Sequence, residues 1–254
     1  PLWPGDSVGE MACLDPAPRS ATVVAVRPTI VYELHRNTLA AMWKHAPSIG
    51  IGLVSGINHE LISRLRETDR RIASAMGRMS ILDSQIMGSS RPSSRPLEQR
   101  PQPSRFRGRL DARRLSSRSG LSPQELQSLA RVARPKEWEA GQPIFEEGEI
   151  GDSCIIIAEG EVEVLKSGSR NPRVIATLHE GAIVGQIALL EQGQRTASVR
   201  ARGRVIGLEV TADIFQALLR DGHPLGVRLL TLTAIAGVRQ LRMATRRLAE
   251  IRAA

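Results

Sequence analysis

Three residues near the start of the chain have types and a spacing that suit the binding of a phosphorylated sugar. Gly9 precedes an acidic residue, Glu10, and Arg19 follows nine residues after that acid. A tight glycine turn that opens a short helix points backbone N–H groups at an anion, and a planar guanidinium can hold two phosphate oxygens. An ionised carboxylate only accepts hydrogen bonds, which suits ribose hydroxyls. The segment therefore predicts a pocket for a ribose that carries a phosphate.

The neighbouring residues fit the same pocket. Ser20 can add a hydroxyl to the phosphate or the base, and small side chains leave room for a ligand against the backbone. Arg19 alone would be interpreted as a surface arginine, but its coupling to a glycine and an acid favours a ligand contact. The predicted site comprises Gly9, Glu10, Met11, Ala12, Arg19, Ser20 and Ala21.

The segment recurs later in the chain without a gap. Residues 8–25 (VGEMACLDPAPRSATVVA) and 184–201 (VGQIALLEQGQRTASVRA) are identical at eight of eighteen positions, at a constant offset of 176. After each copy we expect a short strand, from Val31 and from Val205, then a helix and a break at a proline, Pro47 or Pro224. An internal repeat of this kind indicates two copies of one structural unit.

The paired motif resembles the phosphate-binding cassette of the cyclic-nucleotide-binding domain family. That family includes the regulatory subunits of cyclic-AMP-dependent kinase, the bacterial catabolite activator and the cyclic-nucleotide-gated channels. The resemblance covers nearly all of residues 121–254 and the C-terminal part of the unit at 1–80. It implies a β-roll of eight strands with flanking helices. It also implies that Arg19 binds the cyclic phosphate, Glu10 the ribose 2′-hydroxyl and the backbone of residues 9–12 the remaining phosphate oxygens.

The second copy departs from this pattern because Gln186 replaces the acid. A neutral amide loses the charge-assisted part of the hydrogen bond, about 1–2 kcal/mol. The second unit could therefore bind weakly, bind another ligand or be structural, and Arg195 could instead pair with Glu191. Thr196 resembles the threonine of cyclic-GMP-preferring members. The corresponding candidate residues are Gly185, Gln186, Ile187, Ala188, Arg195, Thr196 and Ala197.

The fold class predicted is α+β: an antiparallel, jelly-roll-like β-roll with flanking helices, in two copies, the first lacking its N-terminal half. Only seven residues precede the first repeat, whereas 63 residues from Leu121 precede the second. We expect the C-terminal part of a cyclic-nucleotide-binding domain at 1–57, an amphipathic helix at 58–87 and a second such domain with a C-terminal helix at 121–254. Between them, residues 88–120 are rich in Arg, Ser and Pro and predict a flexible linker.

Local signals place several elements. Asn58 is a candidate N-cap for the helix at 59–79, and Ser122 followed by Pro123 predicts a helix start. Residues 154–166 (CIIIAEGEVEVLK) predict two strands around a turn at Glu159–Gly160. A second long helix is expected at 226–251.

The charge is concentrated in one segment. The net charge is +9, and nine arginines against two acids between residues 88 and 120 supply +7 of it. One aromatic residue, Phe106, is too few for the stacking expected of single-strand binders, so nucleic acid is an unlikely partner. No apolar run reaches the roughly 18 residues of a membrane span. The thiols Cys13 and Cys154 and the scattered histidines show no metal-ligand spacing, and two free thiols fit a cytoplasmic location.

Three functions compete. The first is a regulatory module that senses a cyclic nucleotide, cyclic AMP more readily than cyclic GMP, and signals by movement of its C-terminal helices. The second is a ligand-independent scaffold that forms a homo-oligomer or binds an effector protein through helices 58–87 and 226–251. The third, less favoured, is a DNA-binding regulator, because no recognition helix follows either long helix. The sequence contains no Ser–His–Asp pattern, P-loop or kinase signature, so neither an enzyme nor a resident cofactor is expected.

Overall fold

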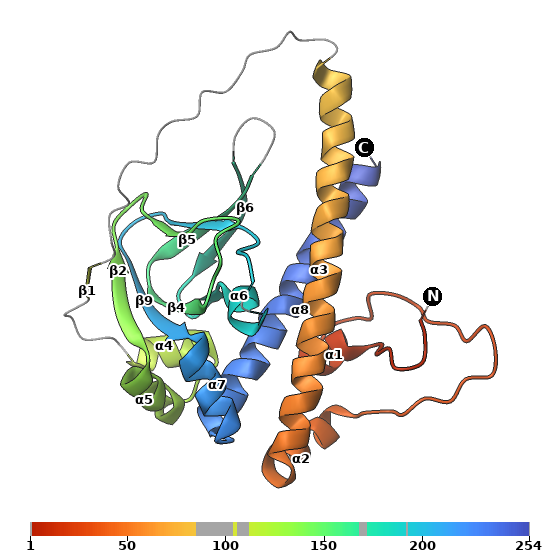
Figure 1. Ribbon diagram of the computed structural model, residues 1–254, viewed down its shortest axis with the longest axis horizontal. Coiled ribbons are helices and arrows are strands. Elements are labelled where there is room, and N and C mark those ends of the chain that lie inside the picture. The colour runs from red at the N-terminus through yellow and green to blue at the C-terminus, as the bar shows by residue number, and fades with distance from the viewer. Residues whose placement is uncertain (1, 85–103, 106–111, 168–171, 192, 254) are drawn as a thin grey trace.

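The computed structural model describes residues 2–84, 104–105, 112–167, 172–191 and 193–253. Figure 1 shows a β-roll on one side, two long helices beside it and an N-terminal arm on the far side of those helices. The helices are α1 (Glu10–Leu14), α2 (Arg36–His45), α3 (Pro47–Ser84), α4 (Ala112–Ser119), α5 (Pro123–Val132), α6 (Gln186–Glu191), α7 (Ala212–Arg220) and α8 (Pro224–Ala253). The strands are β1 (Ser104–Arg105), β2 (Arg134–Trp138), β3 (Pro143–Phe145), β4 (Ser153–Glu159), β5 (Glu161–Lys166), β6 (Arg173–His179), β7 (Ile183–Val184), β8 (Ser198–Ala201) and β9 (Val205–Thr211).

The second unit is a roll of two antiparallel sheets. One sheet has the order β1-β2-β9-β4-β7 and the other β3-β8-β5-β6. Apolar residues from both sheets, such as Trp138, Val162 and Val205, form a core between them. β5 alternates between buried and partly exposed residues, whereas β4 is buried almost throughout because its other face packs under the helices. The predicted α+β class with an antiparallel roll and flanking helices is confirmed.

The local signals in this unit give the expected structure. Ser122 caps α5 by accepting from the N–H of Glu125, and the Glu125 side chain accepts from the N–H of Ser122 in return, which is a complete capping box. Gly160 makes the turn between β4 and β5 at a φ of 90°. A Cβ there would lie 2.4 Å from the carbonyl oxygen of Arg204, so only glycine fits.

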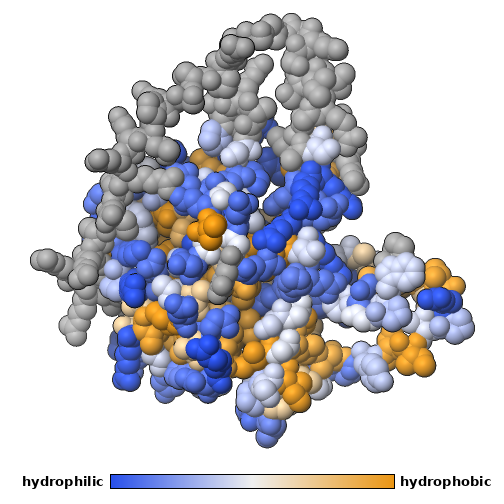
Figure 2. Space-filling model, in the orientation of Figure 1, coloured by the Kyte–Doolittle hydropathy of each residue, from blue (hydrophilic) through white to orange (hydrophobic). Residues whose placement is uncertain are grey.

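The first unit contains α1, α2 and α3 but no sheet among its described residues. The strand expected from Val31 is wrong: residues 20–35 form neither helix nor strand. In the second unit the corresponding strand, β9, pairs with β2 and β4, whereas no described residue of the first unit pairs with residues 20–35 in a sheet. Large apolar side chains of this segment are therefore exposed, with Val26 at 95% and Tyr32 at 101%. Figure 2 shows hydrophobic atoms in orange on this arm.

The two units meet along α3 and α8, which run side by side in the same direction (Figure 1). α3 begins at Pro47, before the predicted start of the helix at 58, and the N-cap prediction for Asn58 is wrong, since Asn58 lies buried inside the helix. The proline breaks before the two helices are confirmed, because α3 begins at Pro47 and α8 at Pro224. The packed stripes consist of Val54, Ile57, Leu61, Ile62 and Leu65 from α3 and Leu225, Leu229, Leu230, Ala234, Val238 and Leu241 from α8.

The predicted linker at 88–120 is ordered at two places. Ser104 and Arg105 form β1 and pair with Glu137 and Lys136, and residues 112–119 form α4, which packs on α5. The remainder of that prediction lies outside the described residues. No helix in the described part of the chain is long and apolar enough to cross a membrane.

Candidate functional site

The first cassette, residues 9–22, has the turn that the sequence predicts. Gly9 adopts a φ of 84° and precedes α1. Arg19 returns to this turn and donates a hydrogen bond from Nη1 to the carbonyl oxygen of Gly9 at 3.1 Å. A Cβ on Gly9 would lie 2.6 Å from this Nη1 atom, so the absence of a side chain lets the guanidinium approach. The structure therefore brings the glycine turn and the arginine together.

Glu10 lies under this turn and is only 6% exposed. Its Oε1 accepts from Nη1 of Arg64 on α3 at 2.8 Å. Its Oε2 is buried and accepts no hydrogen bond from any described residue. A buried carboxylate oxygen without a donor is costly, so this atom is available to a hydroxyl donor.

The second cassette, residues 185–198, repeats the geometry. Gly185 adopts a φ of 79°, and Arg195 donates from Nη1 to the carbonyl oxygen of Gly185 at 3.0 Å. Arg195 is more deeply held than Arg19, with an exposed fraction of 7%. Its Nη1 also donates to the carbonyl oxygen of Ser153 at 2.6 Å, and its guanidinium lies 3.6 Å from the ring centroid of Phe145. Burial lowers the pKa of Arg195 from its usual value.

The alternative pairing of Arg195 with Glu191 is wrong. Glu191 instead pairs with Arg66 at 2.6 Å and with His59 at 3.5 Å, both from α3. Arg195 satisfies its donors on backbone carbonyls and on Oγ of Ser153 at 3.3 Å. Three of the five N–H donors of Arg195 are thus engaged by described residues.

The replacement of the acid in the second cassette is matched by a replacement on the long helix. Position 240 is related to position 64 by the repeat offset of 176, and it carries glutamine where the first copy has arginine. Nε2 of Gln186 lies 3.5 Å from Oε1 of Gln240, where Glu10 and Arg64 form an ion pair in the first copy. The first unit thus has a charged pair, Glu10 with Arg64, where the second has a neutral pair, Gln186 with Gln240.

A second pair of contacts crosses between the units. Asp15, just after α1, pairs with Arg242 of α8 at 2.5 Å. Glu191, the last residue of α6, pairs with Arg66 of α3. The offset of 176 relates Asp15 to Glu191 and Arg66 to Arg242. Each unit therefore uses the same residues to hold the other, which is the isologous contact of a two-fold dimer formed within one chain.

Sequence reasoning missed these helix residues, although the repeat offset applied to α3 and α8 would have found them. The other predicted residues have the following places. Met11 and Ala12 are half-buried, while Ser20 and Ala21 are exposed. In the second copy Ile187 and Ala188 are buried, and Thr196 and Ala197 are half-buried.

The cysteines lie in different surroundings. Cys154 is buried, and its burial raises the pKa of the thiol to about 12. Cys13 is half-buried, and both thiols are free. Among the described residues no group of His, Cys, Asp and Glu could hold a metal ion.

Fold and site together define a class: a protein with two phosphate-cassette units, one complete roll and one partial unit, joined through their long helices. The model of the cyclic nucleotide-binding domain matches residues 2–46 and 135–221, just over half of the chain. The chain belongs to the cyclic nucleotide-binding domain family.

Several known proteins are similar to parts of this chain. A cAMP-dependent protein kinase regulatory subunit of Yarrowia lipolytica is 27% identical over 216 residues, 85% of this chain and 43% of that protein. The acetyltransferase Pat of Mycolicibacterium smegmatis is 34% identical over 101 residues, 40% of this chain and 30% of that protein. The structure of the Thermus thermophilus catabolite activator protein has a TM-score of 0.46 at 28% identity, covering 54% of this chain and 62% of that one. The chain thus spans less than half the length of these two curated relatives.

Proposed function

We propose that this chain is a regulatory module, not a catalyst, that binds a cyclic nucleotide at the first cassette. The observation that carries the proposal is the buried Oε2 of Glu10, which has no donor among the described residues and lies in the same cassette as Arg19. A ribose hydroxyl would supply the missing donor, and the cyclic phosphate would take the guanidinium of Arg19. Met11, Ala12, Ser20 and Ala21 would line the remainder of the site.

Cyclic AMP is the preferred ligand of this proposal over cyclic GMP. Its support is that several relatives are cAMP-dependent protein kinase regulatory subunits, whereas a cGMP-dependent protein kinase is 30% identical over 98 residues. In the first cassette Ser20 stands at the position of Thr196, the residue that resembles the cyclic-GMP pattern.

The second cassette would act as a structural copy. Arg195 is buried against Phe145 and already donates to two carbonyl oxygens. A phosphate would have to displace these bonds and would find Gln186 in place of the acid. Binding would lose the hydrogen bonds of Arg195 and would lack the charge-assisted bond that an acid at position 186 would give. Both effects favour a second unit that supports the first and does not bind a nucleotide.

The signal would leave the first cassette through the long helices. Glu10 contacts α3 through Arg64, and Asp15 at the other end of α1 contacts α8 through Arg242. A ligand that binds one arrangement of α1 more tightly would shift the equilibrium toward that arrangement, by a free energy equal to the difference in affinity. The positions of α3 and α8 would change with it.

Isothermal titration with cyclic AMP and with cyclic GMP tests the proposal. We expect saturable binding with a stoichiometry of one, tighter for cyclic AMP. Arg19→Ala should weaken it by about 2–4 kcal/mol, because a charge-assisted contact to the phosphate is lost. Arg27→Ala, an exposed arginine of the same arm, is the matched control and should leave affinity unchanged. An absence of both heat and thermal shift with either nucleotide would refute the proposal.

A ligand-independent scaffold is the second candidate. It is favoured by the neutral pair Gln186–Gln240, which stands where the first unit has Glu10–Arg64, and by the burial of Arg195. In that case the helices around 58–87 and 226–251 would bind an effector or a second copy. Light scattering separates the two functions. A stable oligomer whose mass and melting temperature ignore both nucleotides would favour the scaffold.

A further inference from the structure

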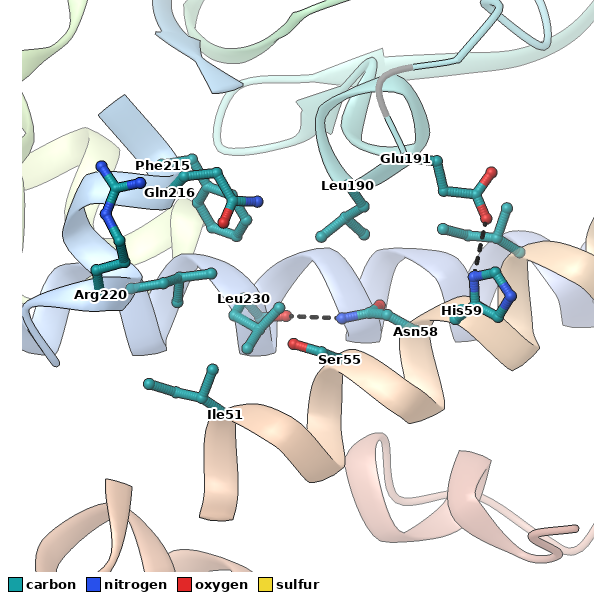
Figure 3. A pocket seen from close by; sticks show the side chains of 12 residues that line it. Ile51, Ser55, Asn58, His59, Leu190, Glu191, Phe215, Gln216, Arg220 and Leu230 are labelled. Carbon is teal, nitrogen blue, oxygen red and sulfur yellow. Dashed lines mark hydrogen bonds and ion pairs between the residues drawn. The ribbon is translucent and has the colours of Figure 1, made fainter. Parts of the chain in front are cut away.

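A groove lies where the two units meet, beside the last turn of α6 in the second cassette. It has a volume of about 410 Å³ and is walled by α3 of the first unit and by α6, α7 and α8 of the second (Figure 3). Pockets of 300–1,000 Å³ are the size that small ligands occupy. The lining residues that decide its chemistry are Asn58, His59, Phe215, Gln216, Leu219 and Arg220.

The repeat provides an internal comparison for this groove. Because the offset of 176 also relates α2 to α7 and α3 to α8, each lining residue has a counterpart on the opposite side of the molecule. Three polar lining residues have apolar counterparts. These pairs are Asn58 with Ala234, His59 with Ile235 and Gln216 with Ala40. The groove has thus acquired hydrogen-bonding groups that the equivalent place lacks.

Two apolar lining residues of α7 have counterparts of a different size: Phe215 has Leu39, and Leu219 has Trp43. Leu219 lines the groove, and its counterpart is Trp43, whose indole packs into the core and against Gly50. A Cβ on Gly50 would lie 2.7 Å from the indole, so the fit is close. At the equivalent place the indole belongs to Trp43 and lies beside Leu39, whereas at the groove the ring belongs to Phe215 and the smaller Leu219 takes the position of Trp43.

The floor of the groove holds a buried amide that is incompletely paired. Asn58 is 3% exposed, and its Nδ2 donates to the carbonyl oxygen of Leu230 over a long 3.4 Å. Its Oδ1 accepts no hydrogen bond from another described residue, and it is not sealed from solvent. A ligand with an N–H or O–H group can therefore donate to this atom in place of water.

A cation marks one end of the groove. Figure 3 shows Arg220 at one end and the ion pair of His59 with Glu191 at the other, with Asn58 between them. The guanidinium of Arg220 forms no ion pair or hydrogen bond with any other described residue, whereas Glu191 is paired with Arg66. The net charge offered to an occupant is therefore positive and lies at the Arg220 end.

We propose that this groove is a second ligand site, for a small aromatic anion. Its ring would lie among Phe215, Leu219 and Ile51, its donor group would meet Oδ1 of Asn58, and its anionic group would meet Arg220. The occupant would contact both units at once, so it would bias the packing of α3 on the second unit. The proposal does not rest on nucleotide binding at the first cassette.

The probe for the test is 1-anilinonaphthalene-8-sulfonate, which carries aromatic rings, an N–H donor and a sulfonate. We expect one saturable site by fluorescence titration, with movement of the Ile51 and Ile62 methyl signals in NMR spectra. Leu219→Trp should fill the groove as Trp43 does and abolish this site. Arg220→Gln should weaken it about tenfold through loss of the charge-assisted contact. Lys44→Gln, at the repeat counterpart of Arg220, is the control and should change nothing.

Circular dichroism and melting temperatures establish that each variant is folded. The proposal is overturned if the wild-type protein shows no saturable site, or if Leu219→Trp titrates as the wild type does. It is also overturned if the methyl signals of Ile51 and Ile62 do not move, because the probe then binds elsewhere, for example on the exposed apolar arm. A mass by light scattering that doubles for the wild type and not for Leu219→Trp would assign the groove to a second copy instead.

Discussion

Arg19 and Arg195 hold the same position in the repeat and differ in how much of their charge is already compensated. Arg19 is exposed and makes one hydrogen bond, to the carbonyl oxygen of Gly9. Arg195 is buried, makes three, and lies over the ring of Phe145. The same residue type thus offers a contact to a ligand in one unit and contributes to the core in the other.

The buried arginine should therefore matter for stability. Arg195→Ala removes the side-chain donor from the carbonyl oxygen of Ser153 and leaves that of Gly185 with the N–H of Leu189 alone, so we expect a loss of about 2–4 kcal/mol in the free energy of unfolding. Urea denaturation measures it. Arg200→Ala, an exposed arginine on β8, should change the free energy by less than about 0.5 kcal/mol. Equal effects of the two substitutions would contradict a structural role for Arg195.

Cys154 gives a pH dependence of known sign. Burial raises the pKa of its thiol from 9.0 to about 12, so the folded protein keeps this proton at pH values where the unfolded chain has lost it. The contribution of this thiol to stability is complete below pH 9 and is lost as the pH rises toward 12. Between pH 9 and 10.5 we expect the wild type to lose about 1–2 kcal/mol more than Cys154→Ala. Parallel stability curves for the two proteins would argue against this.

At the scale of elements, α1 and α6 each connect their own long helix with that of the other unit. α1 contacts α3 through Glu10 and α8 through Asp15. α6 contacts α8 through Gln186 and α3 through Glu191. The short cassette helices α1 and α6 therefore link the two units, because each of them contacts both long helices.

The matched exchange at positions 186 and 240 can be reversed. Gln186→Glu alone buries a carboxylate against a neutral amide and should lower the free energy of unfolding by about 2–3 kcal/mol. Adding Gln240→Arg should recover most of this, with a coupling energy of about 1–3 kcal/mol in a double-mutant cycle. The same cycle with Glu10→Gln and Arg64→Gln serves as the reference in the first unit. Additive effects in both cycles would show that the two positions are not coupled.

Sequence reasoning succeeded where the signal was local. The capping box at Ser122, the turn at Gly160 and the glycine–arginine geometry of both cassettes depend on residues a few positions apart. It failed where the partner is distant. Asn58 was predicted to be an N-cap from its residue type alone. It instead lies inside α3, where its side chain contacts the carbonyl oxygen of Leu230, 172 residues away. The strand expected from Val31 did not form, because a strand exists only where neighbouring strands pair with it.

At the scale of the whole molecule, the two units form a dimer within one chain. The apolar stripes of α3 and α8 and the crossed ion pairs join them. We expect these contacts to hold the units together without the chain segment between them. The interface should therefore survive a cut in that segment.

A protease site inserted between Glu98 and Gln99 tests this. After cleavage we expect both pieces to elute together in size-exclusion chromatography, because the helix interface stays intact. Arg66→Asp combined with Arg242→Asp places two carboxylates opposite each other in both crossed pairs. The repulsion should weaken the interface, so that the cleaved pieces separate when the protein is diluted. Arg71→Asp, an exposed position on α3, is the control. Separation of the cleaved wild type would show that the linkage is needed.

The crossed pairs Asp15–Arg242 and Glu191–Arg66 have a consequence for how such a molecule can evolve. In a symmetric homodimer every substitution appears twice, so a change that improves one site is imposed on the other. Here the equivalent positions are encoded separately, and each can change alone. One copy can then keep Glu10 and Arg64 while the other adopts Gln186 and Gln240. Fusion into one chain releases the two halves from identity while the shared interface keeps them together.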